Sequence, residues 1–160
     1  MGEQRAAFGE AGQIVPQGSV KFGYTTGNGD RSDIAIEPGA LYFIMDNLAV
    51  GGSVTLDRVG VSGGSTTTVG IAPTAAYNLP LVDKLTLFPQ AALVLVHTSI
   101  ADTSGTVIAL SAFAPVLYHV TSHFFLGAGP LLSFDLIVPS GMSHSFVIEL
   151  ETTIGGYFSL

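Results

Sequence analysis

Six charged residues of this chain have the types and spacing that could bring them together in one narrow space. They are Lys21, Glu37, Asp57, Asp135, Glu149 and Glu151. A cation among several carboxylates can form a buried ion-pair network, or it can line a path for cations or protons where water enters. Unbalanced negative charge in such a space requires water, a bound cation or a protonated glutamate. Whether these groups meet depends on the elements that carry them.

Histidines suggest two other sites. His97 and Ser99 share one face of an extended strand, and Asp102 is the nearest acid. Catalysis by the serine would need a carboxylate to orient the histidine, together with an oxyanion site. His119 and His123 flank a short turn and are four residues apart, but not on a helix. We expect an interfacial polar pair and a solvated turn, and we predict neither catalytic residues nor a metal site.

An alternation with a period of two residues identifies the elements. In the last segment, Phe146, Ile148, Leu150, Ile154 and Phe158 alternate with Val147, Glu149, Glu151, Thr153 and Tyr157. This period is typical of a β-strand with an apolar face and a polar face. Eight strands are predicted, at residues 13–25, 33–45, 48–59, 66–79, 85–98, 106–118, 124–136 and 145–158. Tighter connections follow the second, fourth and sixth strands.

The composition favours a membrane β-barrel. The 160 residues are 48% hydrophobic and only 11% charged, with a mean hydropathy of +0.54, whereas about 25% of an average soluble domain is charged. No apolar run approaches the length of a spanning helix, so the hydrophobicity lies in short alternating segments, as in transmembrane barrels. The net charge of −7 argues against a nucleic-acid partner. We expect residues 1–12 to be an N-terminal tail and residues 13–160 a single barrel domain.

Volume predicts which face of the strands points outward. An eight-stranded barrel has an interior just wide enough for side chains to fill. The bulky face, which includes Val54, Ile71, Leu93, Phe113, Leu117, Phe134 and Ile148, should therefore face lipid. The small and polar face, which includes Gly39, Ser53, Ala72, Ala112, Gly127 and the six charged residues, should line the lumen. In the fifth and sixth strands, Phe88, Val94, Val96, Ile108 and Leu110 are also placed inside, which predicts a partly dry and plugged lumen.

Outward aromatic residues are expected in two girdles at the membrane interfaces. Tyr42, Tyr77, Phe124 and Phe158 are assigned to the tight-turn end, and Tyr24, Phe134 and Phe146 to the looped end. Counting outward from the first loop places Lys21 directly across from Glu37.

Six prolines lie inside predicted strands, at Pro16, Pro38, Pro73, Pro89, Pro115 and Pro130. Because proline cannot donate to a sheet ladder, bulges or unpaired positions are predicted where Pro73 lies roughly opposite Pro89, and Pro115 roughly opposite Pro130.

The segment at 38–53 resembles the periplasmic hairpin of small outer-membrane β-barrel proteins, the OmpA/OmpX/OmpW-like group. Gly155-Gly156-Tyr157-Phe158 is similar to the aromatic-ended last strand of that family, although Ser159 and Leu160 follow it here. The resemblance implies an all-β, eight-stranded antiparallel up-and-down transmembrane barrel in the bacterial outer membrane, with its signal peptide removed. It also implies lipid and lipopolysaccharide as surroundings, the outer-membrane assembly machinery as a partner during biogenesis, a monomeric state and no cofactor.

Three functions remain open. The first is a non-enzymatic barrel with a largely plugged lumen and short external loops, in a structural or envelope-interaction role. The second is a small channel for ions or apolar solutes. The third is a soluble oligomeric or lipocalin-like barrel that binds a hydrophobic ligand. His97-Thr98-Ser99 is similar to a motif of barrel lipid A deacylases, but Ile100 interrupts the pattern, so no enzyme is predicted.

Overall fold

The computed structural model describes residues 7–25, 31–61, 64–100, 103–140 and 143–160, with the backbone alone at 20–25, 31–36, 56–61, 64–67, 99–100 and 103. The strands are β1 (Gln13–Thr25), β2 (Arg31–Met45), β3 (Leu48–Val61), β4 (Gly64–Tyr77), β5 (Leu79–Val82), β6 (Leu85–Leu87), β7 (Gln90–Ile100), β8 (Thr103–Phe113), β9 (Val116–Thr121), β10 (Phe124–Ile137), β11 (Phe146–Gly156) and β12 (Phe158–Ser159). None of the described residues form a helix long and apolar enough to cross a membrane.

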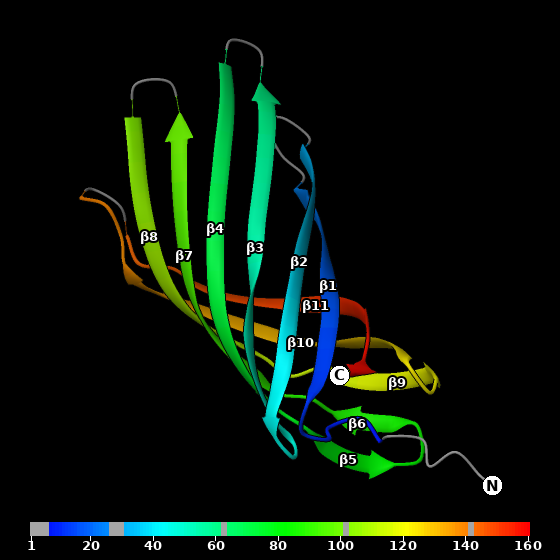
Figure 1. The fold of residues 1–160 in the computed structure, drawn as a ribbon. Coiled ribbons are helices and arrows are strands. Elements are labelled where there is room, and N and C mark those ends of the chain that lie inside the picture. Colours follow the sequence, from blue (N-terminus) through cyan, green and yellow to red (C-terminus); the bar gives the residue numbers. More distant parts are fainter. Residues whose placement is uncertain (1–6, 26–30, 62–63, 101–102, 141–142) are drawn as a thin grey trace, which may run out of the picture.

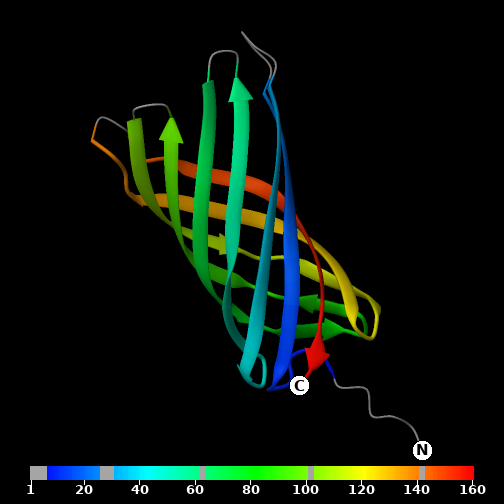
Figure 2. The ribbon, with the colours of Figure 1, turned by 45° about the horizontal axis from the view of Figure 1, so that its top comes forward.

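The strands form a closed antiparallel ring of eight (Figures 1 and 2). Its order is β11-β1-β2-β3-β4-β7-β8-β10, and the pairing of β10 with β11 closes it. Three predicted strands are each interrupted once, so that β4 continues as β5, β6 as β7, and β8 as β9. The prediction of an eight-stranded up-and-down barrel is therefore confirmed.

Prolines explain two of the three interruptions. Pro89 separates β6 from β7, and Pro115 separates β8 from β9, because neither can donate a backbone hydrogen bond. Pro73 falls where β4 and β7 lack paired residues, between Ile71 and Thr74. The unpaired positions are thus confirmed.

The predicted pairing of the prolines is only partly right. Pro89 does not face Pro73, because its carbonyl accepts a hydrogen bond from the Tyr77 amide (2.9 Å). The carbonyl of Pro130 accepts from the amide of Ala114, next to Pro115 (3.1 Å). The prediction that Pro115 and Pro130 lie roughly opposite each other is therefore confirmed.

Two-residue turns join the strands at one end of the barrel. They are Asp46-Asn47, Asp83-Lys84 and Ser122-His123. Asn47 and Lys84 both have a φ of 67°, the left-handed conformation that tight turns require. The C-terminus lies at the same end (Figure 2), where the amide of Leu160 donates to the carbonyl of Gly12 (3.4 Å). The expected positions of the tight turns are confirmed.

The bulky side chains point outward, as their volume predicted. Along β11, Leu150 is 77% exposed whereas its neighbour Glu151 is 5% exposed. The same contrast runs around the ring, where Val54, Ile71, Leu93, Phe134 and Ile148 are all exposed. A contiguous apolar belt of this kind requires lipid or another protein to cover it.

The sixth predicted strand is the exception, because its two faces are inverted. Leu117 is fully buried and Phe113 is buried, while Leu110, which was expected inside, is 51% exposed. The facing strand β10 supplies the room. A Cβ on Gly127 would lie 2.5 Å from Cδ2 of Leu117. Large side chains fit in this part of the lumen because glycines stand beside them.

Candidate functional site

The lumen holds an apolar core near the tight-turn end. Its buried members are Val15, Leu41, Phe43, Ala49, Ala76, Phe88, Leu117, Phe125 and Tyr157. Phe8, which precedes the first strand, packs against this core. Tyr157, which lies between β11 and β12, is 5% exposed.

The ring of Phe8 lies at the centre of five other rings. Their centroids are 5.3 Å away for Phe43, 5.2 Å for Phe88, 5.1 Å for His119, 5.7 Å for Phe125 and 5.1 Å for Tyr157. We call these six residues the aromatic plug. Three of the five pairs are edge-to-face, an arrangement that aromatic quadrupoles favour, and the other two are tilted. The five partners come from different parts of the barrel wall, so a ring from outside the wall fills the centre.

Hydrogen bonds hold the segment that carries Phe8. The carbonyl of Phe8 accepts from Nδ2 of Asn78 (2.9 Å), and the carbonyl of Gly9 accepts from the amide of Asn47 (2.7 Å). The amide of Gly12 donates to the carbonyl of Phe43 (2.9 Å). Sequence reasoning assigned residues 1–12 to a tail and missed this contact. The sequence offers one signal for this contact, which is the single large apolar residue Phe8 between Ala7 and Gly9. No alternation around Phe8 indicates that it is buried.

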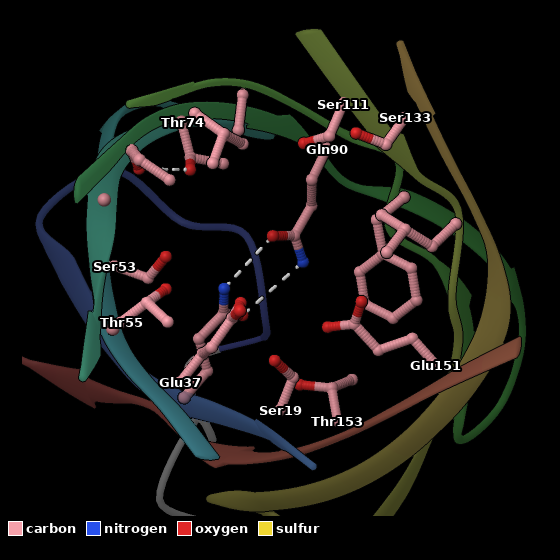
Figure 3. Close-up of a pocket in the computed structure, with 18 of the residues that line it drawn as sticks. Ser19, Glu37, Ser53, Thr55, Thr74, Gln90, Ser111, Ser133, Glu151 and Thr153 are labelled. Carbon is pink, nitrogen blue, oxygen red and sulfur yellow. Dashed lines mark hydrogen bonds between the residues drawn. The ribbon is translucent and has the colours of Figure 1, made fainter. Parts of the chain in front are cut away.

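Above the plug, two glutamines bridge the lumen. Nε2 of Gln17 donates to Oε1 of Gln90 (3.1 Å), and Nε2 of Gln90 donates back to Oε1 of Gln17 (3.5 Å). Figure 3 shows Gln90 extending toward the middle of the lumen, where dashed lines mark both bonds. β1 and β7 stand four places apart in the ring of eight, so this Gln17–Gln90 bridge joins opposite walls.

A polar cavity of about 300 Å³ lies in the lumen at and above the bridge. Hydroxyl groups from Ser19, Ser53, Thr55, Thr74, Ser111, Ser133 and Thr153 line it, as do the carboxylates of Glu37, Glu149 and Glu151 (Figure 3). Val94, Phe113 and Leu131 form an apolar part of its wall. The cavity can therefore hold water or a small polar solute.

The structure brings three of the six predicted charged residues to this cavity. Asp135 lies apart from them, and its carboxylate accepts hydrogen bonds from the amide (3.0 Å) and the hydroxyl of Ser145. The side chains of Lys21 and Asp57 lie outside the described part of the chain.

The expected pairing of Lys21 with Glu37 is wrong. Lys21 pairs with Ala35, and Ser19 pairs with Glu37. The error arises because β2 begins at Arg31, earlier than predicted, which shifts the pairing by two residues.

The described histidines lie beside hydroxyl groups and aromatic rings. Nδ1 of His97 is 3.0 Å from the hydroxyl of Thr106, whereas the side chain of Ser99 and residue Asp102 lie outside the described residues. His119 is part of the plug, and His123 stacks on Tyr157. In the part of the chain that the structure describes, no group of three or more potential metal ligands occurs.

The predicted girdle residues that the structure describes all lie on the outside. Tyr42, Tyr77, Phe124, Phe158, Phe134 and Phe146 are exposed, and the side chain of Tyr24 lies outside the described part. Contact with the membrane interface remains a prediction for these residues.

The chain matches no protein-family profile and no curated protein by sequence. It is similar in structure to Neisserial surface protein A (TM-score 0.64, 20% identity, covering 94% of this chain and 98% of that one). The N-terminal barrel domain of Pseudomonas aeruginosa OprF is similar too (TM-score 0.60, 17% identity, covering 92% and 98%). So is the outer-membrane protein Ail of Yersinia pestis in a phospholipid bilayer nanodisc (TM-score 0.59, 14% identity, covering 93% and 100%).

The chain has the outer-membrane β-barrel fold. The likeness covers nearly all of this chain and of the neighbouring structures, and it agrees with the expected OmpA/OmpX-like resemblance. Together with the exposed apolar belt, it supports the expected location in the bacterial outer membrane. At these identities the likeness concerns the fold and does not assign a role to any residue.

Proposed function

We propose that the chain is a non-enzymatic outer-membrane barrel that is closed to ions and solutes and has a structural or envelope-interaction role. The observation that supports the closed lumen most directly is the position of Phe8. Its ring lies within 5.1–5.7 Å of five surrounding ring centroids, at the tight-turn end of the barrel. Interiors packed in this way leave few voids as large as a water molecule.

Short loops support a structural role over recognition of a large partner. The longest connection at the looped end covers residues 138–145, between β10 and β11. Binding surfaces in such barrels are usually built from loops on a rigid scaffold. Lipid and lipopolysaccharide are the proposed surroundings, the assembly machinery is the proposed partner during biogenesis, and we propose a monomer without a cofactor.

Conductance of the purified protein in planar bilayers tests the closed lumen. We expect no current steps from protein that migrates in its heat-modifiable folded form. Regular current steps from that form would contradict the proposal. Fractionation with and without detergent tests the membrane location, because a soluble lipocalin-like barrel would stay in solution without detergent.

A small channel is the second candidate, because carboxylates line the polar cavity. Charges inside a barrel tune ion selectivity. We propose that Glu37, Glu149 and Glu151 form an ion-pair network with Lys21. If the barrel conducts, Glu149→Gln should reduce its preference for cations over anions, whereas Leu150→Gln on the outward face should leave the preference unchanged. An equal effect of both variants would contradict a role for the lumen carboxylate.

A further inference from the structure

Residues 7–12, which we call the stopper, differ from every other part that closes the lumen. All six residues are described, and they lie outside the strands. The other rings of the plug belong to the barrel wall. The stopper is held instead by separate hydrogen bonds to turn and strand ends, such as those from Asn47 and Asn78. We call the place that the Phe8 ring occupies among the other five rings of the plug its seat. The stopper can therefore leave this seat without breaking any pairing between strands.

Two buried polar atoms favour release of the stopper. Oδ1 of Asn78 and Nδ1 of His119 have no hydrogen-bond partner among the described residues. Both side chains touch the stopper, since Asn78 donates to the carbonyl of Phe8 and the His119 ring lies 5.1 Å from the Phe8 ring. A buried polar atom without a partner costs free energy, and water would satisfy it once the stopper leaves. The free energy gained when water binds these two atoms offsets part of the packing energy lost when Phe8 leaves.

The seat also depends on a backbone conformation that few residues adopt. Gly9 has a φ of +103°, and a Cβ there would collide with Nδ2 of Asn78. The seated form thus requires glycine at this position. A substitution at Gly9 provides a way to unseat the stopper while every ring of the plug remains in the chain.

We propose that residues 7–12 are a displaceable stopper, and that the seat of Phe8 is a binding site for one uncharged aromatic ring. The lumen then has two barriers in series, the stopper and the Gln17–Gln90 bridge above it. This inference rests on the proposed closed barrel and adds a part that can open it. With the stopper released and the bridge removed, the polar cavity becomes continuous with the tight-turn end.

Conductance of four proteins tests the stopper. They are the wild type, Gln90→Ala, Phe8→Ala with Gln90→Ala, and Phe134→Ala with Gln90→Ala. The last is a matched control, because Phe134 is exposed on the outer face. We expect current steps from the Phe8 double variant alone. Equal conductance of Gln90→Ala and the Phe8 double variant, both heat-modifiable, would overturn the stopper.

This design separates the two proposals. A conducting wild type would refute the closed barrel, and the stopper would then stand only if the Phe8 double variant conducts more than Gln90→Ala. If the double variant does not fold, Gly9→Ala replaces Phe8→Ala. We expect faster cleavage by a glutamate-specific protease after Glu10 in Gly9→Ala than in the wild type, and unchanged cleavage would overturn the proposal.

Benzene tests the seat itself, because it matches in shape the ring that Phe8→Ala removes from among five other rings. Adding benzene to the Phe8 double variant should suppress its current and raise its unfolding midpoint. The Phe134 control should show no rise in its midpoint. If benzene changes neither the current nor the unfolding midpoint of the Phe8 double variant, the proposed binding site is wrong.

Discussion

Gln17 and Gln90 are 73 residues apart in the sequence and hydrogen bond to each other across the full width of the barrel. Each side-chain amide can both donate and accept, so the two glutamines bond reciprocally without adding charge. The bridge lies between the aromatic plug and the polar cavity, and both glutamines line the cavity. It therefore marks the level at which the lumen changes from packed to polar.

Removing one glutamine should weaken the barrel slightly. We expect Gln90→Ala to lower the free energy of unfolding by about 1 kcal/mol, because the amide of Gln17 loses a partner in a partly buried site. Urea titrations followed by heat-modifiable gel mobility measure this change. Ser104→Ala, at an exposed position, should have no measurable effect. A double-mutant cycle with Gln17→Ala should show coupling, and strictly additive effects would contradict the bridge.

Gly129 is expected to be essential for folding. A Cβ there would collide with the carbonyl of Ala114 and lie 2.6 Å from Cα of Pro115, and the backbone cannot yield as a side chain can. Gly129→Ala should therefore cost about 3 kcal/mol or more, at the upper end of overpacking effects. The fraction of heat-modifiable protein after refolding measures it.

Gly18→Ala is the matched control for this strand position. Its added Cβ would meet only the carbonyl oxygen of Glu37 at 3.8 Å, an ordinary contact. We expect normal refolding of this variant. Equal loss of the folded form in both variants would show that alanine is excluded for a reason other than close backbone approach.

Charge on the outer belt should be costly in lipid. Leu150 is 77% exposed on β11, so an arginine there would face acyl chains. We expect Leu150→Arg to cost about 2–4 kcal/mol if Leu150 lies near the bilayer midplane. Reversible unfolding in lipid vesicles measures the cost. Leu160→Arg, at the chain end, should cost about 0–1 kcal/mol, and an equal cost at both positions would contradict the proposed belt.

Asn78 should control the seating of residues 7–12. Its Nδ2 donates to the carbonyl of Phe8 and to Oδ1 of Asn47, both at 2.9 Å. Asn78→Asp replaces this donor by a carboxylate facing two acceptors, so the segment should leave its seat while the ring of strands stays closed. Faster cleavage after Glu10, with unchanged heat modifiability, is the expected result.

Asp46→Asn is the control for that experiment. Oδ1 of Asp46 accepts a hydrogen bond from the amide of Ala11 (3.0 Å), and an asparagine oxygen can accept the same bond. We expect cleavage close to the wild-type rate in this variant. If Asn78→Asp were cleaved no faster than Asp46→Asn, Asn78 would not hold the segment.

Local alternation in the sequence determined the strands, the tight turns and most of the outward face. The eight predicted strands and the three two-residue turns follow from a period of two and from turn residues, which depend only on near neighbours. Along β11 the alternation is so regular that each residue from Phe146 to Glu151 was assigned to a face. The volume of a narrow barrel then decided which face points to lipid.

Tertiary structure decided what fills the lumen. The faces of β8 and β9 depend on glycines in β10, which make room for Leu117. The pairing of Lys21 depends on where β2 begins, and the Gln17–Gln90 bridge depends on ring closure between strands distant in sequence. The seat of Phe8 exists only when five parts of the wall surround one point. Such contacts cross the barrel, so no periodicity along the chain encodes them.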